Sequence, residues 1–84
     1  MQVEQMTQKQ LRAFVFEHRY DDEIDMEVLK QVVYRTLRFG VRKTTLCDRI
    51  QYTEGEVDRF LTGKSTPRPI IRRVIFGQIA ELLQ

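Results

Sequence analysis

The chain has 84 residues, of which 42% are hydrophobic and 31% charged, and its formal net charge is +2. This length suffices for one domain with a single modest core, so residues 1–84 are expected to fold as one unit. The longest apolar runs, such as 13–16 and 74–76, fall far below the ~20 residues that span a bilayer, so no membrane segment is expected.

The few potentially reactive side chains point to no chemistry. Cys47 is the only cysteine and His18 the only histidine, so neither an internal disulfide nor a zinc site can be assembled. We expect Cys47 to act as a small buried hydrophobe, and we expect no metal, no cofactor and no enzymatic activity. The N-terminus lacks the cationic start and apolar run of a secretory signal, which predicts a cytoplasmic protein.

Charge is distributed unevenly along the chain. Residues 1–34 hold four lysines and arginines against seven carboxylates, whereas residues 35–73 hold ten against four. A polyanion would be drawn to the second segment rather than the first.

The first two predicted helices cover residues 8–19 and 24–39. Thr7 and Gln10 have capping-box spacing, and Met6 can pack on Leu11 across that cap. Acidic residues within 22–25 favour the start of the second helix. Gly40 can adopt the left-handed conformation that ends it.

Three further helices are predicted at residues 43–50, 54–62 and 69–83. Thr53 and Glu56 form a second capping-box pattern only three residues after the helix that ends at residue 50. Gly63 ends the next helix, and Pro69 suits the first position of the last one. No segment alternates with period two, so an all-α fold of five helices is expected.

A Leu-Cys pair at 46–47, a hydroxyl residue at 53, a valine at 57, a glycine at 63 and a proline at 67 lie within residues 46–67, which resemble the helix-turn-helix of the lambda repressor and Cro-like family. In that family a small residue follows a leucine in the first helix, a hydroxyl residue caps the second, a buried aliphatic residue follows, and a glycine precedes a proline. The matching positions here are Leu46, Cys47, Thr53, Val57, Gly63 and Pro67. Gln51 and Tyr52 replace the Gly-Val often found at the turn, and Arg42 stands where a Ser or Thr usually caps.

The resemblance covers about residues 29–79 and makes the N-terminal helix an addition to the family fold. It implies a sequence-specific, double-stranded DNA-binding transcriptional regulator, and the small size suggests a phage-like or plasmid-like one. The implied base contacts are Glu54, Gly55, Asp58, Arg59 and Thr62. The implied phosphate contacts are Arg42, Lys43, Thr44, Lys64, Ser65, Arg68, Arg72 and Arg73.

The acidic residues of the second helix of the pair favour a different hypothesis. Glu54, Glu56 and Asp58 would repel phosphate, although a glutamate can accept a hydrogen bond from cytosine in the major groove. The alternative is a non-catalytic protein-interaction module, an antirepressor or adaptor, that uses the same fold to bind a regulatory protein.

The last predicted helix has a wide apolar face. Part of it should close the core, and the remainder either completes that core or forms the seam of a homodimer. The candidate residues for such a seam are Ile75, Ile79, Leu82 and Leu83.

Overall fold

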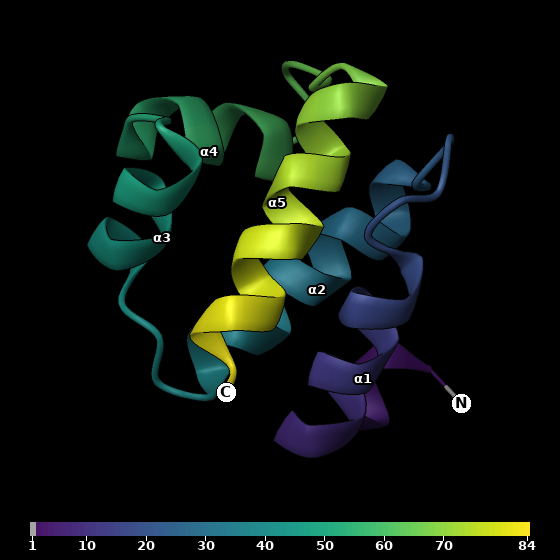
Figure 1. Ribbon diagram of the computed structural model, residues 1–84. Helices are drawn as coiled ribbons and strands as arrows, with labels where there is room; N and C mark the ends of the chain where they lie inside the picture. Colours follow the sequence, from purple (N-terminus) through teal and green to yellow (C-terminus); the bar gives the residue numbers. More distant parts are fainter. Residues whose placement is uncertain (1) are drawn as a thin grey trace.

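Side-chain caps set the starts of three of the five α-helices in the computed structural model, which describes residues 2–84 (Figure 1). These residues form a short 3-10 helix and five α-helices, and none of them forms a strand. The elements are η1 (Val3–Gln5), α1 (Gln8–His18), α2 (Met26–Arg38), α3 (Lys43–Ile50), α4 (Glu54–Leu61) and α5 (Pro69–Leu82). The all-α prediction is confirmed.

Both predicted capping boxes are present. In the first, the Gln10 amide N–H donates to Thr7 Oγ1 at 3.2 Å and the Thr7 N–H donates to Gln10 Oε1 at 2.9 Å. Helix α2 begins two residues later than predicted because the Asp25 carboxylate accepts from the Glu27 N–H at 3.0 Å and is itself the N-cap. Gly40 ends the α2 segment at φ +103°, as expected.

The 3-10 helix η1 was not predicted, and an arginine holds it in place. Val3 and Met6 are buried, and the Arg35 guanidinium donates to the Met6 carbonyl from Nε at 3.2 Å and from Nη2 at 3.0 Å. The N-terminal segment is thereby fixed against α2. Arg35, one of the ten basic residues of the central segment, serves the fold.

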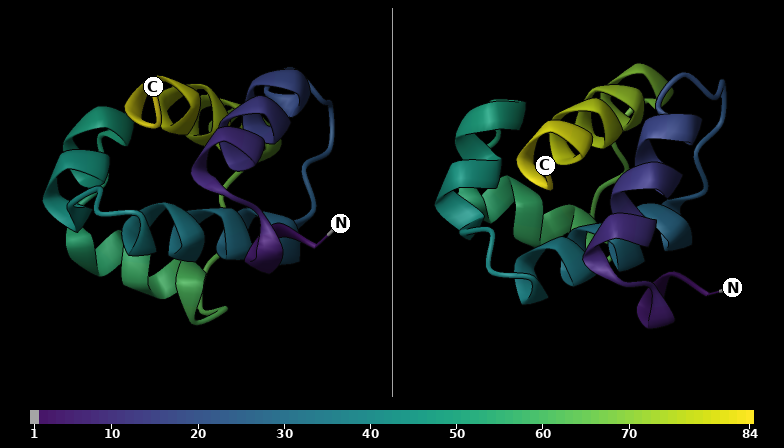
Figure 2. Two further views of the ribbon diagram at one scale, coloured as in Figure 1. Left: turned by 90° about the horizontal axis from the view of Figure 1, so that it is seen from below. Right: turned by 60° about the horizontal axis from the view of Figure 1, so that its bottom comes forward.

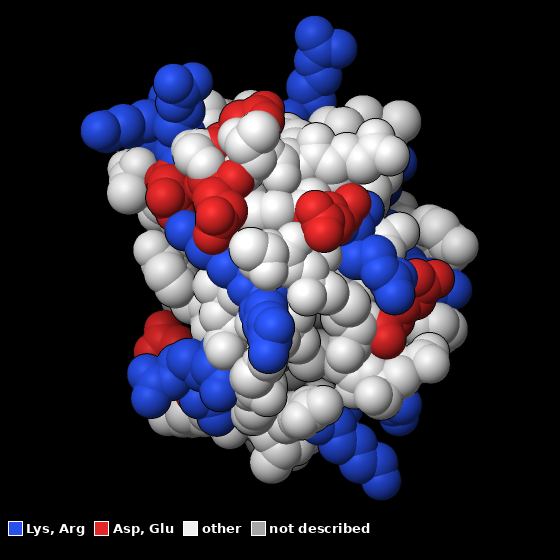
Figure 3. Space-filling view, turned by 90° about the vertical axis from the view of Figure 1, so that its left-hand side faces the viewer, with Lys and Arg blue, Asp and Glu red and all other residues white. Residues whose placement is uncertain are grey.

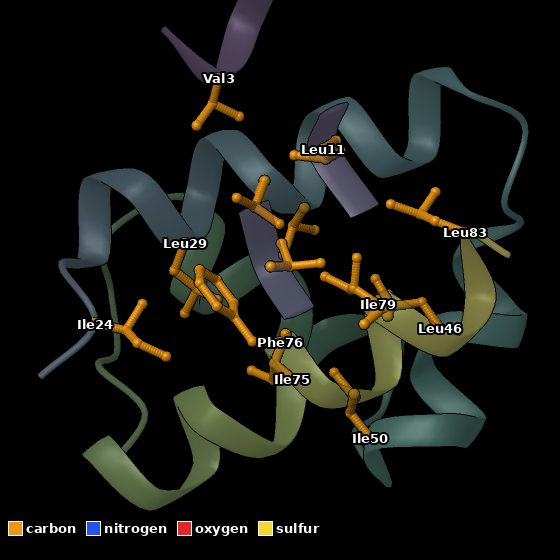
Figure 4. Close-up of a cluster of buried hydrophobic side chains, with 14 of the residues drawn as sticks. Val3, Leu11, Ile24, Leu29, Leu46, Ile50, Ile75, Phe76, Ile79 and Leu83 are labelled. Atoms are coloured by element: carbon orange, nitrogen blue, oxygen red, sulfur yellow. The ribbon is translucent and has the colours of Figure 1, made fainter. Parts of the chain in front are cut away.

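Helix α5 runs through the middle of the molecule, with α1 on one side, α3 on the other and α2 across them (Figures 1 and 2). Its buried residues meet apolar side chains from α1, α2 and α3 in one cluster (Figure 4). No helix within residues 2–84 combines the length and apolarity needed to cross a membrane.

The dimer candidates on α5 are mostly inaccessible, which corrects the prediction for them. Ile75 and Ile79 are fully buried and Leu83 is 3% exposed, while Leu82 is half-buried. Helix α5 has two apolar sides, and the sequence alone does not tell which of them is buried. The side that carries Ile75 and Ile79 closes the core. A dimer seam on α5 would have to use another side of the helix.

Helices α3 and α4 are joined by the three residues 51–53. Gln51 adopts the left-handed conformation, with φ 59° and ψ 40°, and the Tyr52 N–H donates to the Cys47 carbonyl at 3.0 Å. The Tyr52 ring packs edge-on against Phe60 of α4, with centroids 6.1 Å apart. The chain thus reverses sharply after α3 and presses α4 back onto the core.

Gln51 should be replaceable by glycine with a gain in stability, because a Cβ in the left-handed region costs about 1–2 kcal/mol and glycine's extra unfolded-state entropy offsets only part of that. We expect Gln51→Gly to raise the free energy of unfolding by about 0.5–1 kcal/mol, measured by urea denaturation. Gln51→Val should lower it by about 1–2 kcal/mol, since a β-branched residue is strained there. Gln78→Gly, within α5, is the control and should lose about 1 kcal/mol.

Candidate nucleic-acid interface

Helix α4 is held on the core by one face and leaves the other uncovered. Val57 and Phe60 are fully buried. At its start, the Glu56 amide N–H donates to Thr53 Oγ1 at 3.1 Å and the Thr53 N–H donates to Glu56 Oε1 at 3.0 Å. The hydrogen bond from the Thr53 N–H to the Glu56 carboxylate, together with the Thr53 hydroxyl, lowers the pKa of Glu56 below its usual value, so its carboxylate serves the cap as an anion.

The five base-contact candidates share the uncovered face of α4 and its C-terminal end. They follow helical spacing, and all are exposed: Glu54, Gly55, Asp58, Arg59 and Thr62. The Thr62 hydroxyl donates to the Asp58 carbonyl at 2.8 Å, which turns that side chain back onto its own helix.

The end of α4 is fixed by backbone hydrogen bonds that lead into a basic loop. Gly63 has φ +81°, its N–H donates to the Phe60 carbonyl at 3.3 Å, and the Lys64 N–H donates to the Arg59 carbonyl at 2.8 Å. This pattern is a Schellman motif. The loop that follows presents Lys64, Ser65 and Arg68 to solvent.

At the start of α3, two phosphate candidates are exposed and a third is already paired. Arg42 and Thr44 are exposed, and no side chain caps the helix there. Lys43 instead contacts the Asp58 carboxylate of α4. The hydrogen bond that Lys43 donates to the Asp58 carboxylate raises the pKa of Lys43, and the nearby Glu54 carboxylate raises it further. Lys43, a predicted phosphate contact, and Asp58, a predicted base contact, thus lie together and neutralise each other's charge.

The two arginines predicted to contact phosphate from α5 are engaged within the fold. Arg72 donates from Nε to the Pro67 carbonyl and from Nη1 to the Ile24 carbonyl, both at 2.9 Å. Arg73 lies 3.7 Å from the Asp22 carboxylate. Arg72 therefore ties the loop before α5 to the segment before α2, a role that its place in the sequence did not reveal.

Intramolecular partners hold half of the ten central cations. Arg35, Lys43, Arg49, Arg72 and Arg73 have such partners, whereas Arg38, Arg42, Arg59, Lys64 and Arg68 contact no side-chain carboxylate within residues 2–84. On the face that carries α3 and α4, basic and acidic side chains are interspersed, and several basic ones project from its rim (Figure 3). The face is mixed in charge rather than uniformly basic.

Cys47 is buried at 5% exposure, where it lies with Leu46 and Ile50 on the core side of α3. Burial raises the pKa of its thiol above the ordinary value, which keeps it protonated and poorly nucleophilic. A packing role, as predicted, fits this environment.

Comparisons with known protein families, with characterised proteins and with solved structures find no match to this chain.

The role of Arg72 can be separated from that of its neighbour Arg68. Arg72→Met keeps much of the apolar stem but removes two hydrogen bonds from a charged donor, so we expect a loss of about 1–3 kcal/mol in the free energy of unfolding. Arg68→Met removes the same charge from an exposed side chain and should stay within about 0.5 kcal/mol of the parent. Thermal and urea denaturation of both variants measure the difference, and equal losses would contradict the assignment.

Proposed function

We propose that this chain is a double-stranded DNA-binding transcriptional regulator in which α3 and α4 form a lambda repressor-like helix-turn-helix and α1 is an added helix. The observation that carries the proposal is the presentation of α4. One face of it is buried through Val57 and Phe60, the other is fully open, and exposed cations lie at the start of α3 and directly after α4. A helix with its outer face open and cations nearby suits the major groove between two phosphate backbones.

In this arrangement α4 contacts base edges and the flanking segments contact phosphates. Arg59 can donate to guanine, and Glu54 can accept from the cytosine amino group. The phosphate contacts are assigned to the exposed residues Arg42, Thr44, Lys64, Ser65 and Arg68. Arg72 is left out of this set because its guanidinium serves the fold.

The second candidate function is a non-catalytic adaptor or antirepressor, favoured by the charge of α4 itself. Glu54 and Asp58 are exposed, and Asp58 neutralises Lys43 at the start of α3. An acidic helix face of this kind suits a basic groove on another protein. In this reading the exposed cations at the rim are solvated and take no part in binding.

An electrophoretic shift on random genomic fragments, repeated across salt concentrations, tests DNA binding. Each phosphate contact contributes about −0.9 to the slope of log K against log salt. Arg42→Gln, Lys64→Gln and Arg68→Gln should therefore each flatten the slope by about 0.9. Arg38→Gln, on α2 beside Glu4 and Tyr34, is the control with equal charge change and should leave the slope unaltered. Absence of any shift at low salt would refute the proposal.

Asp58 should restrain binding through Lys43. Asp58→Asn releases the Lys43 ammonium for a phosphate contact, and we expect DNA affinity to rise about threefold to tenfold. The gain should disappear in a Lys43→Gln background. Asp48→Asn, on the exposed side of α3, removes the same charge without freeing a partner and should give a smaller change.

The same variants discriminate against the adaptor. The adaptor hypothesis is correct if two results are obtained together. Neither the parent nor any variant binds DNA, and the parent captures a basic protein that the Asp58→Asn variant no longer captures. If Asp58→Asn tightens DNA binding equally with and without Lys43, the restraint is a general charge effect.

A further inference from the structure

The exposed apolar side chains of this protein gather in one place. Within residues 2–84, five large hydrophobic residues are notably exposed, and four of them, Phe16, Tyr20, Ile70 and Val74, line one groove between α1 and α5. Each of the four is between 44% and 76% exposed. Single exposed hydrophobics are ordinary on a protein surface, but a contiguous apolar groove marks an interaction site.

The groove arises because α5 is apolar on two sides. Ile71, Ile75 and Ile79 point toward the core, while Ile70 and Val74 follow helical spacing along the outer side. Helices α1 and α5 pack together and run in opposite directions, so the end of α1 lies beside the start of α5 (Figures 1 and 2). A helix that is apolar on both sides is expected to be covered on both.

Gly77, in the middle of α5, gives a second and independent indication. Glycine within a helix costs about 1 kcal/mol relative to alanine. A Cβ at position 77 would meet nothing within 4 Å, so the packing of this chain does not require glycine there. Gly77 lines the groove. Close approach of another molecule to the α5 backbone would require a glycine at this position.

The charges of the groove are arranged for a second copy of the same chain. Arg19 and Arg73 lie at the end of the groove where α5 starts, and Arg73 is already 3.7 Å from the Asp22 carboxylate. Glu81, the only carboxylate among the described residues that line the groove, lies toward the end of α5. It contacts Arg49 at 3.2 Å, but its side chain is 62% exposed and stays accessible to a second cation. The Arg19 guanidinium is stacked 3.6 Å from the Phe16 ring centroid and has no carboxylate partner within residues 2–84. A two-fold axis across the groove would place the basic end of each copy against the acidic end of the other.

We propose that this groove is a self-association surface, covered by the same groove of a second copy in a two-fold symmetric dimer. The ridge formed by Phe16 and Tyr20 of one copy packs over Gly77 of the other, and Arg19 of each copy joins Arg49 at the exposed Glu81 carboxylate of the other. No residue of α3 or α4 lines the groove, so both α4 helices stay accessible in the dimer. The groove takes the place of the buried residues Ile75 and Ile79 as the candidate dimer surface. Association through it does not require DNA.

Sedimentation equilibrium of the full chain from micromolar to millimolar concentration tests the proposal. We expect a monomer–dimer equilibrium that Val74→Glu weakens by at least about tenfold, because it places a charge in the covered apolar surface. Gly77→Gln is the sharper variant. It should fill the groove and weaken the dimer while raising the melting temperature, since glutamine is the better helix former. Tyr34→Ser, at the exposed hydrophobic residue outside the groove, is the control and should leave association unchanged.

A charge exchange tests the two-fold arrangement itself. Arg19→Glu and Glu81→Arg should each weaken self-association, and an equimolar mixture of the two variants should dimerise at least as well as the parent. A parent chain that stays monomeric throughout the range overturns the proposal and leaves the groove to another partner. A dimer that persists in both Gly77→Gln and Val74→Glu, or a mixture no tighter than the single variants, overturns it as well. A chain that binds DNA as a monomer would contradict the self-association proposal and leave the proposed DNA-binding function intact.

Discussion

The fold depends on the burial of one side of α5 against α1, α2 and α3. An 84-residue chain can build only a modest core, and here a single central helix supplies a large share of it through Ile75, Phe76 and Ile79. Helices α1, α2 and α3 all contact α5, which thereby holds helices that are remote in sequence in one cluster. Arg72 reinforces this arrangement at the start of α5, where its guanidinium joins the segment before α2 to the loop before α5 through the carbonyls of the buried residues Ile24 and Pro67.

Helix α4 lies at the edge of this assembly, and its exposure follows from that position. It contributes Val57 and Phe60 to the core and is oriented by α3, through the left-handed residue Gln51 and the ring contact of Tyr52 with Phe60. Such a helix is rigidly placed yet open along its outer side. This is the physical basis for proposing α4 as the helix that contacts a partner macromolecule.

About half of the basic side chains of residues 35–73 have partners within the described part of the molecule, and the rest are free to contact another molecule. Arg35 fixes η1, Arg49 bonds Glu81 and Lys43 neutralises Asp58. The basic excess of residues 35–73 is therefore much smaller as a surface property than as a sequence property, and it reaches solvent mainly at the two ends of the α3–α4 unit. An interface of this kind relies on a few well-placed cations and on shape rather than on a strong overall field.

The sequence by itself determined the five α-helices of this protein, although not the short helix η1. Two capping boxes, the stops at Gly40 and Gly63 and the start at Pro69 are local patterns, and local hydrogen bonding decides where a helix begins and ends, so the predicted bounds agree within two residues. Only the tertiary structure decided which stripe of α5 is buried and which arginines are occupied. The partners of Lys43 and Arg72 are 15 and 48 residues away, and such distant pairs form only when packing brings separate helices together.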